Sequence, residues 1–197
     1  MRNSEELHPS FTHSQYLFRR KVFKLFGGAF HVYDEADRLV FYSEQKAFRL
    51  KEDFTVFSDE YRSEPLLTIK TPQILDIGAT YHVRDAARDE AVGALRRKAF
   101  KSIVRDEWLL LDSSQSEVGR VSEESWFGAF ASRFIKLIPQ TYAVSDTREA
   151  QVAAIRQHFN PFVLKYTMSI HETDPPIDRR LLVAAGILLA AIERRQD

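Results

Sequence analysis

The chain has 197 residues, of which 44% are hydrophobic, and this length fits one domain with a sizeable core. Its 28 basic residues balance its 28 acidic residues, so no overall charge draws it to nucleic acid, and we expect no nucleic-acid partner. It contains no cysteine, which excludes disulfides, thiolate catalysis and cysteine-ligated metal, and which favours a cytoplasmic setting.

The first segment in chain order, residues 1–14, is polar and lacks the apolar core of a signal peptide. We therefore expect a flexible N-terminal tail over residues 1–14 and a single domain over residues 15–197. We also expect a protein that is not secreted, and that is either free in the cytoplasm or peripheral at its membrane face.

Short apolar strands alternate with polar turns from Tyr16 to Ser125. Three segments follow one plan, in which an apolar strand ends in Asp, a polar turn follows and an apolar strand returns: VYDEADRLVFYS, VRDAARDEAVGALR and LLDSSQSEVGRVS. Regularly spaced hairpins without intervening helices are typical of a β-sandwich or a β-barrel.

Two short amphipathic helices are predicted after these hairpins. Aromatic residues at helical spacing indicate a helix over Trp126–Ile138, and the spacing of Val152 and Ile155 indicates a weaker one over Asp146–Phe159. The next segment, Phe162–His171, alternates apolar and polar residues and predicts a strand.

The last element, Leu181–Ile192, is apolar at every position and predicts a helix without a polar face. Its length of ~18 Å falls short of the ~30 Å core of a bilayer, and arginines flank it on both sides. Such a helix needs protein walls on all sides. We therefore predict a mainly β fold, in which a closed antiparallel barrel of about twelve strands surrounds this C-terminal helix.

The hairpin VRDAARDEAVGAL, the segment LRRKAFKSIVRDEW and the C-terminal FVLKYTMSI…DRRLLVAAGILLAAIE resemble the LURP-one-related and phospholipid-scramblase-like proteins, which belong with the tubby C-terminal domain. The resemblance implies a twelve-stranded barrel threaded by a hydrophobic helix, and an affinity for anionic phospholipid or phosphoinositide headgroups. The Cys cluster, the Pro-rich arm and the acidic calcium-binding segment of animal scramblases have no counterpart here. Lipid movement and calcium control are therefore not implied.

Two basic clusters are the candidate headgroup or phosphate sites, because clustered Lys and Arg donate charge-assisted hydrogen bonds. The first cluster contains Arg96, Arg97, Lys98 and Lys101, with Arg105 beyond them, and the second contains Arg19, Arg20, Lys21 and Lys24. The competing interpretations are a solvated face paired with Asp106 and Glu107 for the first cluster, and an edge strand protected by charge for the second.

No catalytic motif, metal-ligand spacing or cofactor motif is present, so we expect a non-enzymatic protein without metal or cofactor. One alternative is a structural or protein-interaction barrel that contacts a partner through the helix carrying Trp126 and Phe127. A further alternative is an enzyme with a pocket at the barrel mouth, for which His82, Asp85 and Glu107 would have to converge.

Overall fold

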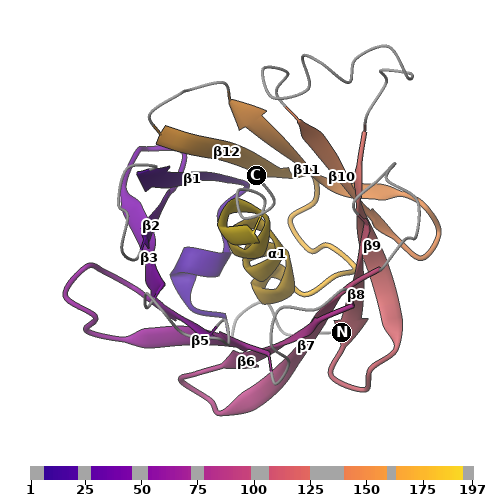
Figure 1. Cartoon of the computed structure of the whole chain (residues 1–197), viewed down its shortest axis with the longest axis horizontal. Helices are drawn as coiled ribbons and strands as arrows, with labels where there is room; N and C mark the ends of the chain where they lie inside the picture. Colours follow the sequence, from indigo (N-terminus) through magenta and orange to yellow (C-terminus); the bar gives the residue numbers. More distant parts are fainter. Residues whose placement is uncertain are drawn as a thin grey trace.

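In the computed structural model, twelve antiparallel strands close into a barrel around one helix, α1 (Arg179–Ile192) (Figure 1). The structure describes residues 7–21, 28–45, 53–71, 78–98, 107–124, 140–158 and 163–192. Each strand pairs with its neighbours in the sequence, and β1 pairs with β12 to close the sheet. The predicted closed barrel with a central C-terminal helix is therefore confirmed.

The strands are short and follow one another as a meander. Their bounds are β1 (Gln15–Lys21), β2 (Gly28–Tyr33), β3 (Leu39–Gln45), β4 (Asp53–Phe57), β5 (Pro65–Lys70), β6 (Thr80–Asp85), β7 (Glu90–Arg97), β8 (Glu107–Asp112), β9 (Glu117–Glu123), β10 (Thr141–Asp146), β11 (Gln151–His158) and β12 (Val163–Ile170).

One end of the barrel, which we call the turn end, is built from repeated Asp turns. In the β2–β3 turn, one carboxylate oxygen of Asp34 accepts hydrogen bonds from the backbone N–H groups of Ala36 and Arg38, at 2.9 and 2.8 Å. Asp85, Asp112 and Asp146 accept backbone N–H groups in the same way in the β6–β7, β8–β9 and β10–β11 turns. The Asp side chain replaces hydrogen bonds that a tight turn leaves unmade, which explains the repeat seen in the sequence.

The Asp146 turn corrects the helix predicted over Asp146–Phe159. Residues 147–150 form the turn between β10 and β11, and Gln151–His158 is a strand paired with β10 and β12. The spacing of Val152 and Ile155 fits a helix locally, but the barrel needs a strand here to satisfy the exposed edges of β10 and β12.

Helix α1 lies on the barrel axis and is buried on all sides, as its sequence predicts. Leu182, Val183 and Ile187 have no exposed surface, and the helix contacts strands from both sides of the barrel. The interior is crowded: a Cβ atom at Gly186 would lie 2.4 Å from Cζ of the Phe18 ring. The small residues of α1 thus leave room for the aromatic side chains of the wall.

Charged groups anchor the start of α1 at the turn end. The Asp178 carboxylate accepts the backbone N–H of Arg180 at 2.9 Å and so caps the helix. The buried Arg180 guanidinium donates to the carboxylates of Asp85, Glu90 and Asp178. Burial acts to lower the pKa of Arg180, but the bonds to Asp178 and Glu90 outweigh it and raise that pKa further.

Part of the expected N-terminal tail packs against the turn end. Residues Pro9–Phe11 form a short 3-10 helix, η2, and the Phe11 ring lies 4.9 Å from that of Phe41 and is almost fully buried. The Arg179 guanidinium donates to the carbonyl oxygens of Phe11 and His13. Burial of Phe11 explains why residues 9–11 are held in place, in contrast to the tail that we expected there.

The connections at the other end of the barrel, where α1 ends, lie outside the described residues. These include the helix predicted over Trp126–Ile138, and with it the proposed contact surface at Trp126 and Phe127. They also include Lys24, Lys101 and Arg105 from the two basic clusters.

Candidate functional site

The two predicted basic clusters lie on opposite walls of the barrel. The second cluster belongs to β1 and the first to β7, and five strands separate β1 from β7 in either direction around the closed sheet (Figure 1). The clusters therefore do not merge into one outer patch. Because β1 pairs on both sides, the interpretation of the second cluster as a charged edge strand is wrong.

Successive residues of a strand point to opposite faces, so each cluster is split between the inside and the outside of the wall. Arg20 points inward, and its guanidinium donates to the carbonyl oxygens of Ala190 and Ala191 at 3.4 and 3.1 Å. It also lies over the Phe30 ring, 5.0 Å from the centroid. Arg20 thus donates to backbone carbonyls near the C-terminal end of α1.

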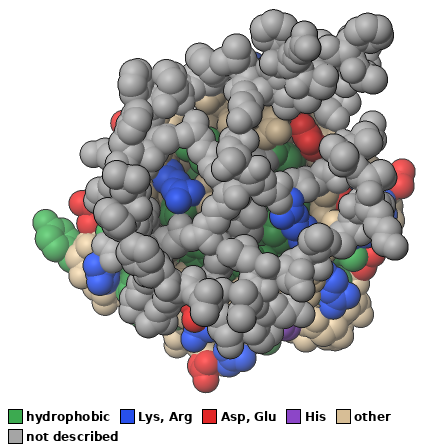
Figure 2. Space-filling view, viewed as in Figure 1, with side chains coloured by type: hydrophobic (Ala, Val, Ile, Leu, Met, Phe, Trp, Pro, Cys, Tyr) green, Lys and Arg blue, Asp and Glu red, His purple; other side chains and the backbone are tan. Residues whose placement is uncertain are grey.

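Arg97 on β7 points into the barrel, as Arg20 does on β1. It pairs in register with the buried Trp108, and its guanidinium lies 5.8 Å from the centroid of that ring. β7 runs from the turn end, where Glu90 bonds Arg180, toward the end where α1 stops. Arg20 and Arg97 therefore lie at the same end of the barrel. Figure 2 shows Lys and Arg side chains within the opening of the barrel, beside hydrophobic ones.

The remaining described members of the first cluster are engaged by neighbouring strands. The Arg96 guanidinium Nε donates to Thr80 Oγ1 at 3.3 Å, and Lys98 forms an ion pair with Glu107 at 2.8 Å. The pairing with Glu107 is the arrangement expected of a solvated face. Asp106, the other carboxylate expected there, lies outside the described residues.

Arg19 has a different environment, because basic side chains from two adjacent strands join it. In the register of the sheet, Lys165 of β12 and His31 of β2 lie directly opposite Arg19, one on each side. We call Lys165, Arg19 and His31 the outer basic row. Lys21 continues the second cluster at the end of β1, where only its backbone is described.

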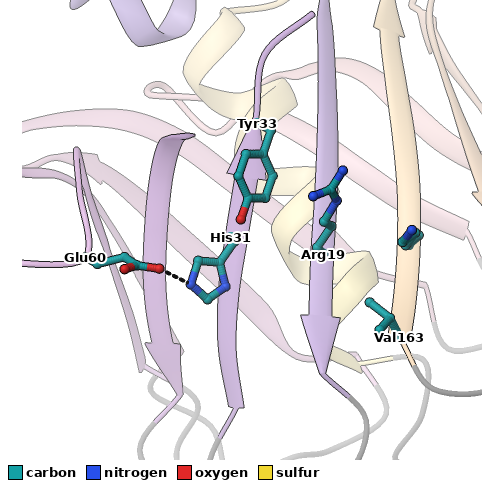
Figure 3. Close-up of a pocket in the computed structure, with 6 residues that line it drawn as sticks. Arg19, His31, Tyr33, Glu60 and Val163 are labelled. Atoms are coloured by element: carbon teal, nitrogen blue, oxygen red, sulfur yellow. Dashed lines mark hydrogen bonds and ion pairs between the residues drawn. The ribbon is translucent and has the colours of Figure 1, made fainter. Parts of the chain in front are cut away.

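The outer basic row lines an open depression of about 440 Å³, completed by Tyr33, Glu60 and Val163 (Figure 3). Figure 3 shows Arg19, His31 and Tyr33 on neighbouring strands, and Glu60 reaching His31 from the β4–β5 turn. The depression lies on the outer surface of the wall, on the opposite side of the sheet from α1.

Contacts in and beside the depression partly offset the repulsion among its cations. Arg19 bonds the Asp37 carboxylate at 3.0 Å, and its guanidinium lies 4.5 Å above the Tyr33 ring. His31 Nε2 lies 2.7 Å from the Glu60 carboxylate. Like charges directly opposite each other across a sheet are destabilising, and these two exposed carboxylates reduce that cost.

One basic group in the row retains the capacity to bind an anion. In the described part of the chain, the Lys165 ammonium has neither an ion pair nor a hydrogen bond, whereas the unpaired Arg19 Nε is buried. An ammonium carries three donors, so Lys165 is the group of the row best placed to meet a phosphate or carboxylate oxygen.

Sequence reasoning identified Arg19 but missed Lys165 and His31. The alternation of Phe162–His171 does place Lys165 on the polar face of its strand. The missing information was that β12 closes the barrel against β1, which brings together two residues far apart in the sequence.

The residues named for a barrel-mouth enzyme do not converge. Asp85 is buried at the turn end against Arg180, whereas Glu107 bonds Lys98 at the opposite end of the wall. His82 is exposed on the outer face of β6. These three side chains therefore do not form an active site together.

One group of possible metal ligands, His13, Asp34 and Glu35, occurs among the described residues. Their carboxylate oxygens are already used by the chain: Asp34 accepts from the Arg38 guanidinium at 2.7 Å, and Glu35 accepts from Ser14. An arginine bonded to one ligand repels a cation, so the group does not fit a metal ion.

In the described parts of the chain, no helix combines the length and the apolar character needed to cross a bilayer. Among known proteins, the family model described as LURP-one-related matches residues 39–190, which is more than half of the chain. A search of curated proteins and a search of solved structures each returned no match.

Proposed function

The chain belongs to the LURP-one-related family, and we propose that it is a non-enzymatic barrel module that binds anionic lipid headgroups at the cytoplasmic face of a membrane. The single observation that carries this proposal is the outer basic row, in which Lys165 and Arg19 lie side by side over an open depression. The absence of cysteine from the whole chain agrees with a reducing compartment.

The distribution of charge favours an approach by the wall. Carboxylates gather at the turn end, where exposed acidic residues include Glu35, Asp37, Glu60, Glu64 and Asp89. An anionic surface repels this end and attracts the basic groups farther along the strands. The barrel would therefore meet the membrane with the β12–β1–β2 wall rather than with the turn end.

The expected binding is weak and sensitive to salt. A Lys or Arg near an anionic membrane surface contributes about 1 kcal/mol, and this attraction falls off within a Debye length of about 10 Å. Two strong cations partly offset by Asp37 and Glu60 thus hold the module reversibly, in a manner that a change of charge at the site can regulate.

The test is sedimentation of the full chain with phosphatidylcholine vesicles, with and without phosphatidylglycerol, at low salt. We expect retention only with phosphatidylglycerol, and a loss of about tenfold or more in affinity for the Arg19→Gln/Lys165→Gln double variant. The matched control is Lys70→Gln/Arg96→Gln, which removes one exposed Lys and one exposed Arg from the opposite wall.

Failure of the wild-type chain to bind at low salt would end the proposal in favour of a barrel that binds protein or serves a structural role. Equal losses in the double variant and its control would show attraction by charge in general, and would contradict a site at the outer basic row.

A further inference from the structure

The titratable member of the outer basic row is His31, which lies between Arg19 of β1 and the Glu60 carboxylate of the β4–β5 turn. Resting on the function proposed above, we propose that protonation of His31 controls the affinity of the outer basic row for anionic headgroups, so that binding strengthens as the pH falls. Histidine is the side chain that ordinarily changes charge between about pH 5 and 8.

The balance of charge in the depression makes this one proton significant. With His31 neutral, the residues that line the depression carry two positive charges, on Lys165 and Arg19, and one negative charge, on Glu60, while Asp37 pairs with Arg19 beside it. A proton on His31 therefore adds a full positive charge to a site whose other two cations are largely offset by carboxylates. The same proton would have a small effect at a site that already carried a large excess of positive charge.

The groups packed around His31 carry charges of both signs. Arg19 of β1 lies directly opposite it, and the Glu60 carboxylate lies 2.7 Å from its Nε2. The rings of Tyr42 on β3 and Tyr33 on β2 also pack against it, with centroids 5.2 and 6.4 Å away.

Glu60 has a second effect, because it competes with an external anion for the same imidazole. Its side chain is 59% exposed and comes from a turn rather than from the sheet, so an incoming headgroup can displace it. Binding and protonation are reciprocal: if the proton strengthens anion binding, the bound anion must favour protonation to the same degree.

The experiment measures retention of the full chain on phosphatidylglycerol vesicles at about pH 8 and about pH 5.5, at constant ionic strength. The phosphodiester of this lipid keeps one negative charge over the range, so a change in binding comes from the protein. We expect affinity to rise about fivefold at the lower pH, and the Glu60→Gln variant to bind more tightly than the wild type at the higher pH.

The decisive variant is His31→Gln, which we expect to lose most of the difference in affinity between the two pH values. His158 lies opposite Lys165 on β11, where its ring bonds the Thr167 hydroxyl, and we expect it to account for the part of the pH effect that the His31→Gln variant keeps. The matched control is His82→Gln, on the exposed face of the opposite wall, which keeps the full effect.

Two results would overturn the inference: equal wild-type affinity at both pH values, or a His31→Gln variant with an undiminished pH effect. In both cases the wild-type chain still binds, and the proposed function stands. Absence of wild-type binding at both pH values would instead remove the proposed function, and the inference with it.

Discussion

Arg19 and Arg20 are neighbours in the sequence, yet they belong to different regions of the molecule. The Arg20 guanidinium lies inside the barrel on the carbonyl oxygens of α1, whereas Arg19 lies outside, over Tyr33 and beside Lys165. Inside the wall, a partly buried charged side chain stabilises the fold through hydrogen bonds to the backbone. Outside the wall, the same type of side chain contributes little to stability and is available to a ligand.

The largest expected effect comes from the buried arginine at the turn end. The Arg180→Met variant leaves the carboxylates of Asp85, Asp178 and Glu90 without their shared cation. We expect a loss of about 3–5 kcal/mol in the free energy of unfolding, measured by urea denaturation.

The matched control for this variant is the same change outside the wall, Arg84→Met, which removes an exposed pair with Asp89. Its expected cost is below about 1 kcal/mol. Similar losses in the two variants would contradict the distinction between the inside and the outside of the barrel.

The second-largest expected loss of stability comes from Arg20, and it distinguishes this residue from its neighbour Arg19. Arg20→Gln removes the cation from the C-terminal end of α1, and we expect a loss of about 1–2 kcal/mol in stability. Arg19→Gln changes stability by less than about 0.5 kcal/mol, but it weakens vesicle retention. Urea denaturation measures the stability of both variants, and sedimentation measures their retention on vesicles. If one variant lost both stability and vesicle retention while the other lost neither, the distinction between Arg20 and Arg19 would be contradicted.

The smallest effect concerns a carboxylate at the surface of the turn end. Burial acts to raise the pKa of Glu35, but hydrogen bonds from its own backbone N–H and from Ser14 and Gln15 outweigh it and lower the pKa to about 2. A pKa that is lower in the folded state stabilises the fold above about pH 4.5, and this contribution is lost as the pH falls through about 2.

We therefore expect the wild type to exceed Glu35→Gln in stability by about 1 kcal/mol at about pH 6, after allowance for the partial exposure of this side chain. Near pH 2 the two proteins should converge. Thermal unfolding across this range measures the difference. The exposed Glu172→Gln serves as the control, and a constant gap at all pH values would exclude the protonation mechanism.

Local patterns in the sequence were sufficient for the central helix and for most hairpins. Leu181–Ile192 has no polar face, so its burial could be predicted from physical chemistry alone. The strand Gln151–His158 was missed because Val152 and Ile155 suit a helix as well as a strand. The strand–Asp–turn plan around Asp146, already visible in three other segments, was the signal that could have corrected it.

The candidate site depended on information that no local pattern contains. Arg19 and Lys165 lie opposite each other only because β1 pairs with β12. Glu60 reaches His31 on β2 from the β4–β5 turn, which follows later in the chain. Alternation within a strand predicts which side chains face outward, but the register between distant strands decides which of them meet.

The pairing of β1 with β12 also sets the order in which the chain can fold. The first strand has to wait for the last strand to be synthesised, and α1, which follows β12, must enter the interior before the sheet seals around it. Contacts between such distant segments slow folding, and until they form, β1 and β12 present unpaired backbone groups to other chains. The interval between the synthesis of β12 and closure of the sheet is consequently the stage at which association with other chains is most favoured.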